Sequence, residues 1–147
     1  MAETLGSLCD KLTIIKLKQW HADDAERLTS LGKQEKQLQG EINTFIQDAI
    51  AGRIPAERLT FASNKIYKKE GNTVADVRGS ISEVFSRLAD VNCKLWHEQE
   101  RVYDFEHVPP DNKDSVVKQL ALLNLERNKC IDEIDRLFRA TVERSAT

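Results

Sequence analysis

Apolar residues recur at intervals of three and four along most of the chain, and this spacing constrains the fold more than any other feature. The clearest series follows Thr73 and runs to about Glu106: Val74, Val77, Ile81, Val84, Leu88, Val91, Leu95, Val102 and Phe105. Such spacing places apolar side chains on one face of an α-helix. Only 6 Gly and 3 Pro interrupt the 147 residues, so long helices can form. We therefore expect one all-α domain over 1–147, an antiparallel bundle of four long helices.

Capping residues and helix breakers set the expected boundaries. Thr4 or Ser7 can cap a first helix that reaches about residue 22, and Asp23 or Asp24 can cap a second that reaches about residue 51. Gly and Pro make 52–72 the irregular segment, with a short helix possible at about 63–69. Thr73 is the expected cap of the third helix, which Pro109-Pro110 end. The last helix is expected to begin at Asp111 or Asp114.

Charge and cysteine content narrow the function classes. The 22 Lys+Arg nearly balance the 24 Asp+Glu, which argues against a nucleic-acid binder. No stretch approaches the roughly 18 consecutive apolar residues of a membrane span, and the first residues lack the pattern of a signal peptide. Cys9, Cys93 and Cys130 form no CxxC pair and are expected to be reduced thiols. We expect a cytoplasmic protein that binds neither membrane nor nucleic acid and carries no cofactor.

Three polar residues stand at core-facing positions of the third and fourth helices. Asn92 lies in the apolar row of the third, and Asn124 and Arg127 lie in the equivalent row of the fourth. Glu35, on the apolar stripe of the second helix, could be the counter-ion of Arg127 if the two lie at the same level of the bundle. Such a cluster either fixes the register of the helices, as a buried asparagine does in coiled coils, or lines a pocket for a small ligand. We expect the first.

The segments 11–21 and 87–97 resemble each other, and each ends in Trp-His. His21 with Asp24, and His97 with Glu100, share the spacing His-x-x-acid, which places both side chains on one helical face. Two such helices could hold a metal ion, as di-iron bundles do, but those bundles use Glu-x-x-His and add a Glu from each of two further helices. Here Glu35 is the one inward Glu, so we expect no metal site.

Three stretches resemble, in order, a bacterial all-α family described as domain of unknown function number 4254. They are residues 10–21, 91–100 and 122–135. The late family motif, Asn-x-x-Arg-Asn-x-x-Ile-acid-x-Ile-Asp, maps onto Asn124, Arg127, Asn128, Ile131, Asp132, Ile134 and Asp135. The middle motif maps onto Asn92, Leu95 and Trp96, and the early aromatic-His pair maps onto Trp20 and His21. His97 stands where the family tends to be acidic.

The resemblance implies an all-α fold and an association with glycosyltransferase and cell-surface polysaccharide genes, and it carries no activity. We therefore expect a non-catalytic helical interaction or accessory protein, with a protein partner in surface-glycan assembly. The alternative is a protein or enzyme that binds a phosphorylated sugar or nucleotide sugar, and a metal-binding bundle is a minor alternative. The candidate binding residues are His21, Glu35, Asn92, Trp96, Asn124, Arg127 and Asn128.

A homodimer is also expected. A third helix of about 34 residues would extend about 50 Å, beyond a first helix of about 30 Å. Its protruding end would expose Val102, Tyr103 and Phe105 as an apolar patch, which a second copy could cover. The competing explanation is that segment 52–72 folds back over that patch.

Overall fold

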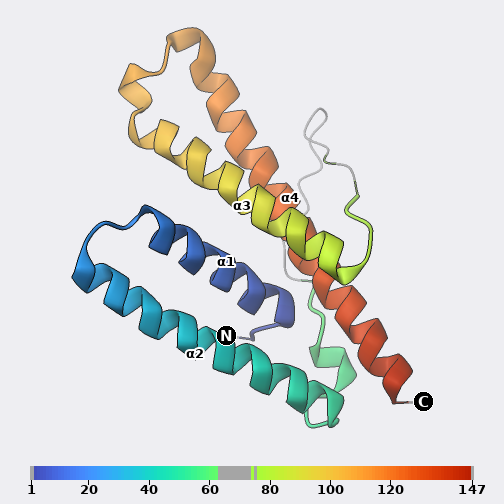
Figure 1. Cartoon of the computed structure of the whole chain (residues 1–147). Helices are drawn as coiled ribbons and strands as arrows, with labels where there is room; N and C mark the ends of the chain where they lie inside the picture. The colour runs from blue at the N-terminus through green and yellow to red at the C-terminus, as the bar shows by residue number, and fades with distance from the viewer. Residues whose placement is uncertain (1, 63–73, 75, 147) are drawn as a thin grey trace.

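The structure is a computed structural model that describes residues 2–62, 74 and 76–146. Within these ranges the regular elements are all helices, which confirms the expected all-α bundle of four long helices (Figure 1). The long helices are α1 (Leu5–His21), α2 (Ala25–Ile50), α3 (Ile81–Tyr103) and α4 (Pro110–Ser145). Two short 3₁₀ turns, η1 (Ala56–Arg58) and η2 (Phe105–His107), lie in the connections that follow α2 and α3. None of these helices is long and apolar enough to cross a membrane.

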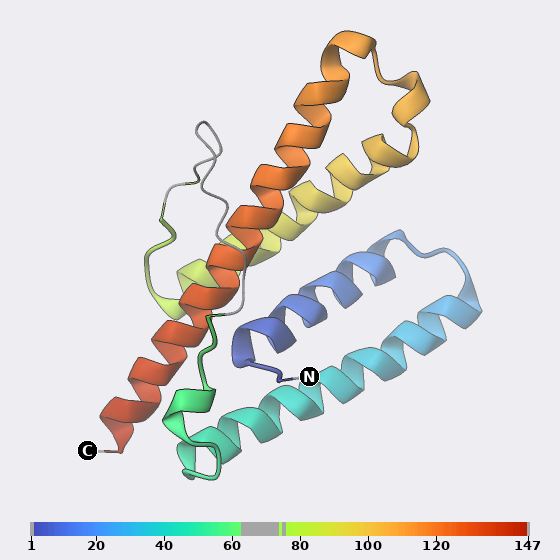
Figure 2. The same ribbon diagram turned by 180° about the vertical axis from the view of Figure 1, so that it is seen from behind.

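The helices form two hairpins that pack through α1. Helices α1 and α2 lie antiparallel, as do α3 and α4, and both views show the two hairpins diverging toward their turns (Figures 1 and 2). Helix α1 contacts all three other long helices, whereas α2 packs on α1 and touches α4 at few points. Much of the surface of α2 is therefore left exposed to solvent.

The first two helices begin where the sequence predicts. The Thr4 hydroxyl accepts from the backbone N–H of Ser7, and the Ser7 hydroxyl accepts from that of Thr4, which completes a capping box. Asp24 caps α2 by accepting a hydrogen bond from the backbone N–H of Glu26. Each cap satisfies an N–H group that has no partner inside its helix.

The third helix is shorter than predicted. It begins at Ile81, not after Thr73, because Gly79 has a φ of +136° and Ser80 forms a capping box with Glu83. It ends at Tyr103, before η2 and well before the two prolines. The predicted short helix at 63–69, and Thr73 itself, lie outside the described residues.

Because α3 is shorter than expected, its length no longer implies an apolar end that protrudes beyond α1. Helix α3 has 23 residues, not about 34. Of the three side chains in the expected patch, Tyr103 is 84% exposed, whereas Val102 and Phe105 are half-buried. Helix α4 is the longest element, and it begins at Pro110, a first-turn position that proline tolerates, rather than at Asp111 or Asp114.

The buried core lies at the end of the bundle where α1 begins and α2 ends. Val77, predicted on the third helix, lies outside it in the preceding segment and is still buried in this core. The residues of the core are Leu5, Cys9, Ala49, Leu59, Val77, Val84, Leu88, Cys130, Ile134 and Phe138.

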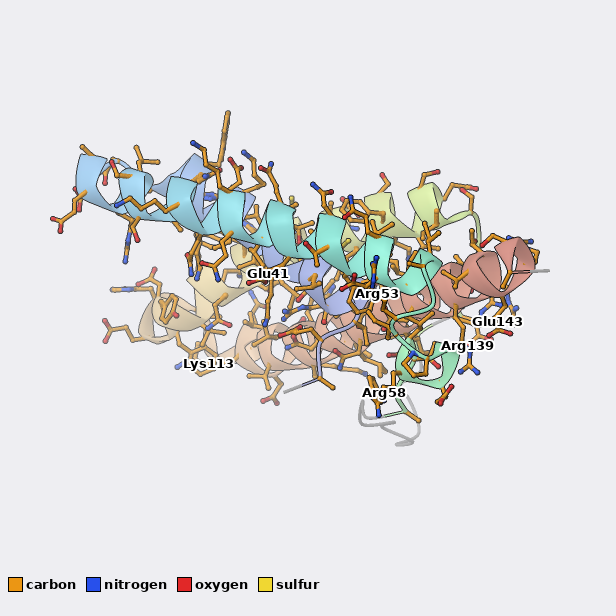
Figure 3. The ribbon with its side chains drawn as sticks, turned by 90° about the horizontal axis from the view of Figure 1, so that it is seen from below. Glu41, Arg53, Arg58, Lys113, Arg139 and Glu143 are labelled. Atoms are coloured by element: carbon orange, nitrogen blue, oxygen red, sulfur yellow. The ribbon has the colours of Figure 1, made fainter. Side chains whose placement is uncertain are left out.

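The connection after α2 is fastened to α4 by a polar contact. Arg139 Nη1 donates to Thr60 Oγ1 at 2.9 Å, and its Nε donates to Glu143 Oε1 at 2.6 Å. Figure 3 shows Arg139 and Glu143 on α4 beside the turn η1, which carries Arg58, while Lys113 lies at the other end of α4. This contact helps to cover the core from the side of η1.

Candidate functional site

A buried carboxylate joins α1, α3 and α4. The Asp10 side chain accepts a hydrogen bond from Asn92 Nδ2 at 2.9 Å and one from Arg127 Nε at 2.8 Å. Its second oxygen pairs with Arg127 Nη2, so the guanidinium binds in a bidentate manner. Asn92 Nδ2 also donates to Thr13 Oγ1 at 2.7 Å. We call Asp10, Thr13, Asn92 and Arg127 the Asp10 cluster.

The Asp10 cluster is largely buried, and Arg127 keeps more of its surface than Asp10 or Asn92. Asp10 is 4% exposed and Asn92 2%, whereas the Arg127 side chain keeps 30% of its surface. The hydrogen bond with Asp10 raises the pKa of Arg127, against the effect of its desolvation. Asn92 Oδ1 is buried with no hydrogen-bond partner among the described residues, so the amide serves the cluster as a donor.

Glu35 is not the counter-ion of Arg127. Glu35 instead accepts a hydrogen bond from Lys16 at 2.6 Å near the surface, and Asp10 takes its place beside Arg127. Asn124 is exposed on α4 and does not join Asn92, and Asn128 is half-buried. The structure thus brings together two of the predicted polar residues, Asn92 and Arg127, with a partner that the sequence analysis did not name.

A groove of about 680 Å³ opens between α1 and α2 above the Asp10 cluster. Arg127 from α4 and Asp10 from α1 contribute to it, with Ile15 and Leu38 among its apolar residues. The other lining residues are mostly polar: Glu3, Lys11, Ile14, Lys18, Gln34, Gln37 and Glu41. We call this the Arg127 groove. Only two guanidinium donors of Arg127 bind Asp10, so the others remain for solvent or a ligand.

A second pocket, of about 340 Å³, lies where α1 ends and α2 begins, and Trp96 of α3 contributes to it. Its lining residues are Lys18, His21, Ala22, Arg27, Ser30, Leu31 and Trp96. We call this the His21 pocket. Lys18 lines both the pocket and the Arg127 groove, so the two are neighbours along α1.

His21 and Trp96, both predicted site residues, form a stacked pair in this pocket. Their ring centroids lie 4.6 Å apart and their planes differ by 18°. His21 Nδ1 lies 2.8 Å from the backbone oxygen of Leu17, and a carbonyl can only accept, so Nδ1 carries the proton. Trp96 Nε1 donates to Glu100 Oε1 at 2.9 Å. Hydrogen bonds therefore fix both rings in place.

Metal-ligating side chains are not gathered in the described part of the chain, and two of the three thiols are buried. Within 2–62, 74 and 76–146, no group of three or more His, Cys, Asp or Glu lies close enough to hold a metal ion. The two predicted His-x-x-acid pairs therefore form no such group, and His21 instead stacks on Trp96. Burial raises the pKa of both Cys9 and Cys130 to about 11, which keeps these thiols protonated and unreactive.

A second buried carboxylate fastens the start of α1 to α4. Asp135 Oδ1 accepts from the backbone N–H of Gly6 at 2.7 Å, and Asp135 also hydrogen-bonds with Thr4. A Cβ atom on Gly6 would lie 2.5 Å from the backbone oxygen of Ile131, so only glycine permits this approach of the helices. Burial raises the pKa of Asp135 to about 6, although its hydrogen bonds oppose the rise.

Comparison with known protein families, with curated proteins and with solved structures found no match to this chain. Membership of the family that the sequence resembles therefore stays a prediction.

Sequence reasoning missed Asp10, Lys18 and Arg27. Asp10 follows the apolar residue Cys9 and looks like a surface acid, although it stands three positions before Thr13 on one helical face. Its shared helical face with Thr13 was the available signal. Lys18 and Arg27 had no such signal, because lysine and arginine near helix ends are common on surfaces.

Proposed function

We propose that this chain is a non-catalytic helical interaction protein that acts as an accessory in surface-glycan assembly. The observation that supports the proposal is the Asp10 cluster, in which Asn92 and two guanidinium donors of Arg127 bind Asp10. These polar side chains fasten three helices in register rather than meeting in a reactive arrangement. The glycan context rests on the resemblance of residues 10–21, 91–100 and 122–135 to the bacterial family.

Helix α2 is the proposed surface for the protein partner. It packs on α1 alone over most of its length, and Leu28 and Ile50 are 40% and 63% exposed. The proposal places the chain in the cytoplasm, where its three free cysteines would remain reduced.

The test is deletion of the gene in its source bacterium, with surface polysaccharide as the readout. Loss of polysaccharide that the wild-type gene restores, but that a Leu28→Glu, Ile50→Glu double variant does not, supports the proposal. The matched control is Lys16→Gln, an exposed change on α1 that should restore polysaccharide fully. Unchanged polysaccharide in the deletion strain would contradict the accessory role.

We also propose that the chain forms a homodimer, because large aromatic side chains remain outside the bundle, with Trp20 85% and Tyr103 84% exposed. Light scattering at micromolar concentration tests this. A mass about twice the 16.8 kDa of the chain supports the dimer, and a mass near 16.8 kDa that persists at high concentration contradicts it.

A second candidate function is the binding of a small phosphorylated ligand. The His21 pocket favours it, because Lys18 and Arg27 line this pocket and no hydrogen bond or ion pair engages either of them within the described part of the chain. A thermal-shift screen with phosphorylated sugars and nucleotide sugars tests it, since a ligand that binds only the native state raises Tm. No shift with either class would reject this candidate.

A further inference from the structure

We propose that the His21 pocket binds a phosphorylated monosaccharide, with its phosphate between Lys18 and Arg27 and its sugar against the His21–Trp96 pair. This inference rests on the second candidate function and names its ligand class and contact residues. Three independent features of the pocket support it: its charge, its aromatic wall and its size.

The charge of the pocket suits a phosphate group. Two of its lining residues, Lys18 and Arg27, are cationic, and none is acidic. Many other cations in the described ranges are paired with carboxylates, as Lys16 is with Glu35. The guanidinium of Arg27 can bind two phosphate oxygens at once, and the Lys18 ammonium adds a point charge.

Two acids that lie close in sequence to pocket residues have hydrogen-bond partners. Asp24, in the turn between α1 and α2, accepts from the backbone N–H of Glu26 at 3.0 Å. Glu100 accepts from Trp96 Nε1 at 2.9 Å on the α3 side. These contacts give the two carboxylates structural roles. Within the described residues, neither the Lys18 nor the Arg27 side chain takes part in a hydrogen bond or an ion pair, so both are available to an anion.

The aromatic pair provides an apolar wall of fixed orientation. The Nδ1 hydrogen bond of His21 and the Nε1 hydrogen bond of Trp96 hold the two stacked rings. Leu31, which is 7% exposed, and Ala22 extend this wall. With Nδ1 engaged, His21 Nε2 is the ring nitrogen left for a sugar hydroxyl. A pocket with apolar walls and a few fixed polar groups is typical of small-ligand sites.

The size of the pocket favours a monosaccharide phosphate over a nucleotide sugar. Its 340 Å³ lies near the lower end of the roughly 300–1,000 Å³ found for ligand pockets. A monosaccharide phosphate fits this volume, whereas a nucleotide sugar would have to extend past Lys18 into the Arg127 groove. We therefore infer a ligand with one sugar ring and one phosphate.

Isothermal titration calorimetry with α-D-glucose 1-phosphate tests the inference, with glucose, inorganic phosphate and uridine diphosphate glucose as comparison ligands. We expect glucose 1-phosphate to bind more tightly than the other three. Lys18→Gln and Arg27→Gln should each weaken its binding about 10-fold or more, because each loses a charge-assisted contact. Lys16→Gln removes the same charge from the same helix outside the pocket and should leave binding unchanged.

Replacement of Trp96 tests the sugar contact separately. Trp96→Leu should weaken glucose 1-phosphate and leave inorganic phosphate unaffected. If circular dichroism shows that Trp96→Leu does not fold, His21→Ala, at an exposed residue, removes the other half of the wall and gives the same test.

The possible results distinguish failure of the monosaccharide phosphate assignment from failure of the candidate function, the binding of a small phosphorylated ligand. If no phosphate-bearing ligand binds, both fail. If glucose 1-phosphate and inorganic phosphate bind equally and loss of the aromatic pair has no effect, the anion site stands and the sugar assignment is overturned. Tighter binding of uridine diphosphate glucose, lost in Lys18→Gln, would overturn the monosaccharide assignment alone.

Discussion

Replacing Arg127 with Met should destabilise the protein more than replacing Asp10 with Asn. In Arg127→Met the Asp10 carboxylate, whose side chain is 6% exposed, loses both guanidinium hydrogen bonds and keeps the one from Asn92. Removing one partner of a buried ion pair costs about 3–5 kcal/mol, because it leaves an uncompensated charge away from water.

The reverse change leaves a charge that water can reach. In Asp10→Asn the amide oxygen still accepts one hydrogen bond, and the Arg127 side chain is 30% exposed, so its guanidinium can be rehydrated. We expect a loss of about 1–2 kcal/mol, in the range of one or two charged hydrogen bonds. The double variant should be more stable than Arg127→Met alone, since it no longer buries an unpaired carboxylate.

Urea unfolding at pH 7, followed by circular dichroism, measures all four proteins of this double-mutant cycle. For a chain of this length, the loss in Arg127→Met should lower Tm by about 10 °C. If Arg127→Met costs under 1 kcal/mol, or if Asp10→Asn costs more than Arg127→Met, an unpaired Asp10 carboxylate is not the costly buried charge, and the reasoning is refuted.

Three further changes test other parts of the fold. Gly6→Ala should lose about 2–3 kcal/mol in urea unfolding, because its Cβ would lie 2.5 Å from the Ile131 backbone oxygen, whereas Gly32→Ala, with nothing within 4 Å, should gain up to about 1 kcal/mol. The pKa of Asp135 is higher in the folded protein, so this residue stabilises the fold by about 3 kcal/mol below pH 3.8, and that contribution should be lost as pH rises through about 6. In Asp135→Asn, the free energy of unfolding measured in urea should not show this fall with pH. Ser80→Ala should lose about 1 kcal/mol through its helix cap, and a Tm unchanged from wild type would contradict the role of Ser80 as the start of α3.

Local signals in the sequence were enough to predict most helix boundaries. Thr4 and Asp24 cap the helices that they were expected to cap, because a cap depends on residues within one turn. The start of α3 was predicted wrongly, since Val74 and Val77 continue the apolar spacing into a segment that is not helical. The Ser80-x-x-Glu83 capping box after Gly79 was the local signal that outweighs this spacing.

The sequence by itself determined that the chain is a helical bundle and which of its faces are apolar. The tertiary structure decided which polar residues meet. Two residues meet only if their helices pack with those faces together and at the same height, and their distance along the sequence does not determine this. Asp10 and Arg127 are 117 positions apart, and the sequence offered Glu35 as the partner of Arg127. In the structure α1, far more than α2, packs against α4, which brings Asp10 to Arg127. The His21 pocket was decided in the same way, since it exists only because the end of α1 and the start of α2 lie against Trp96.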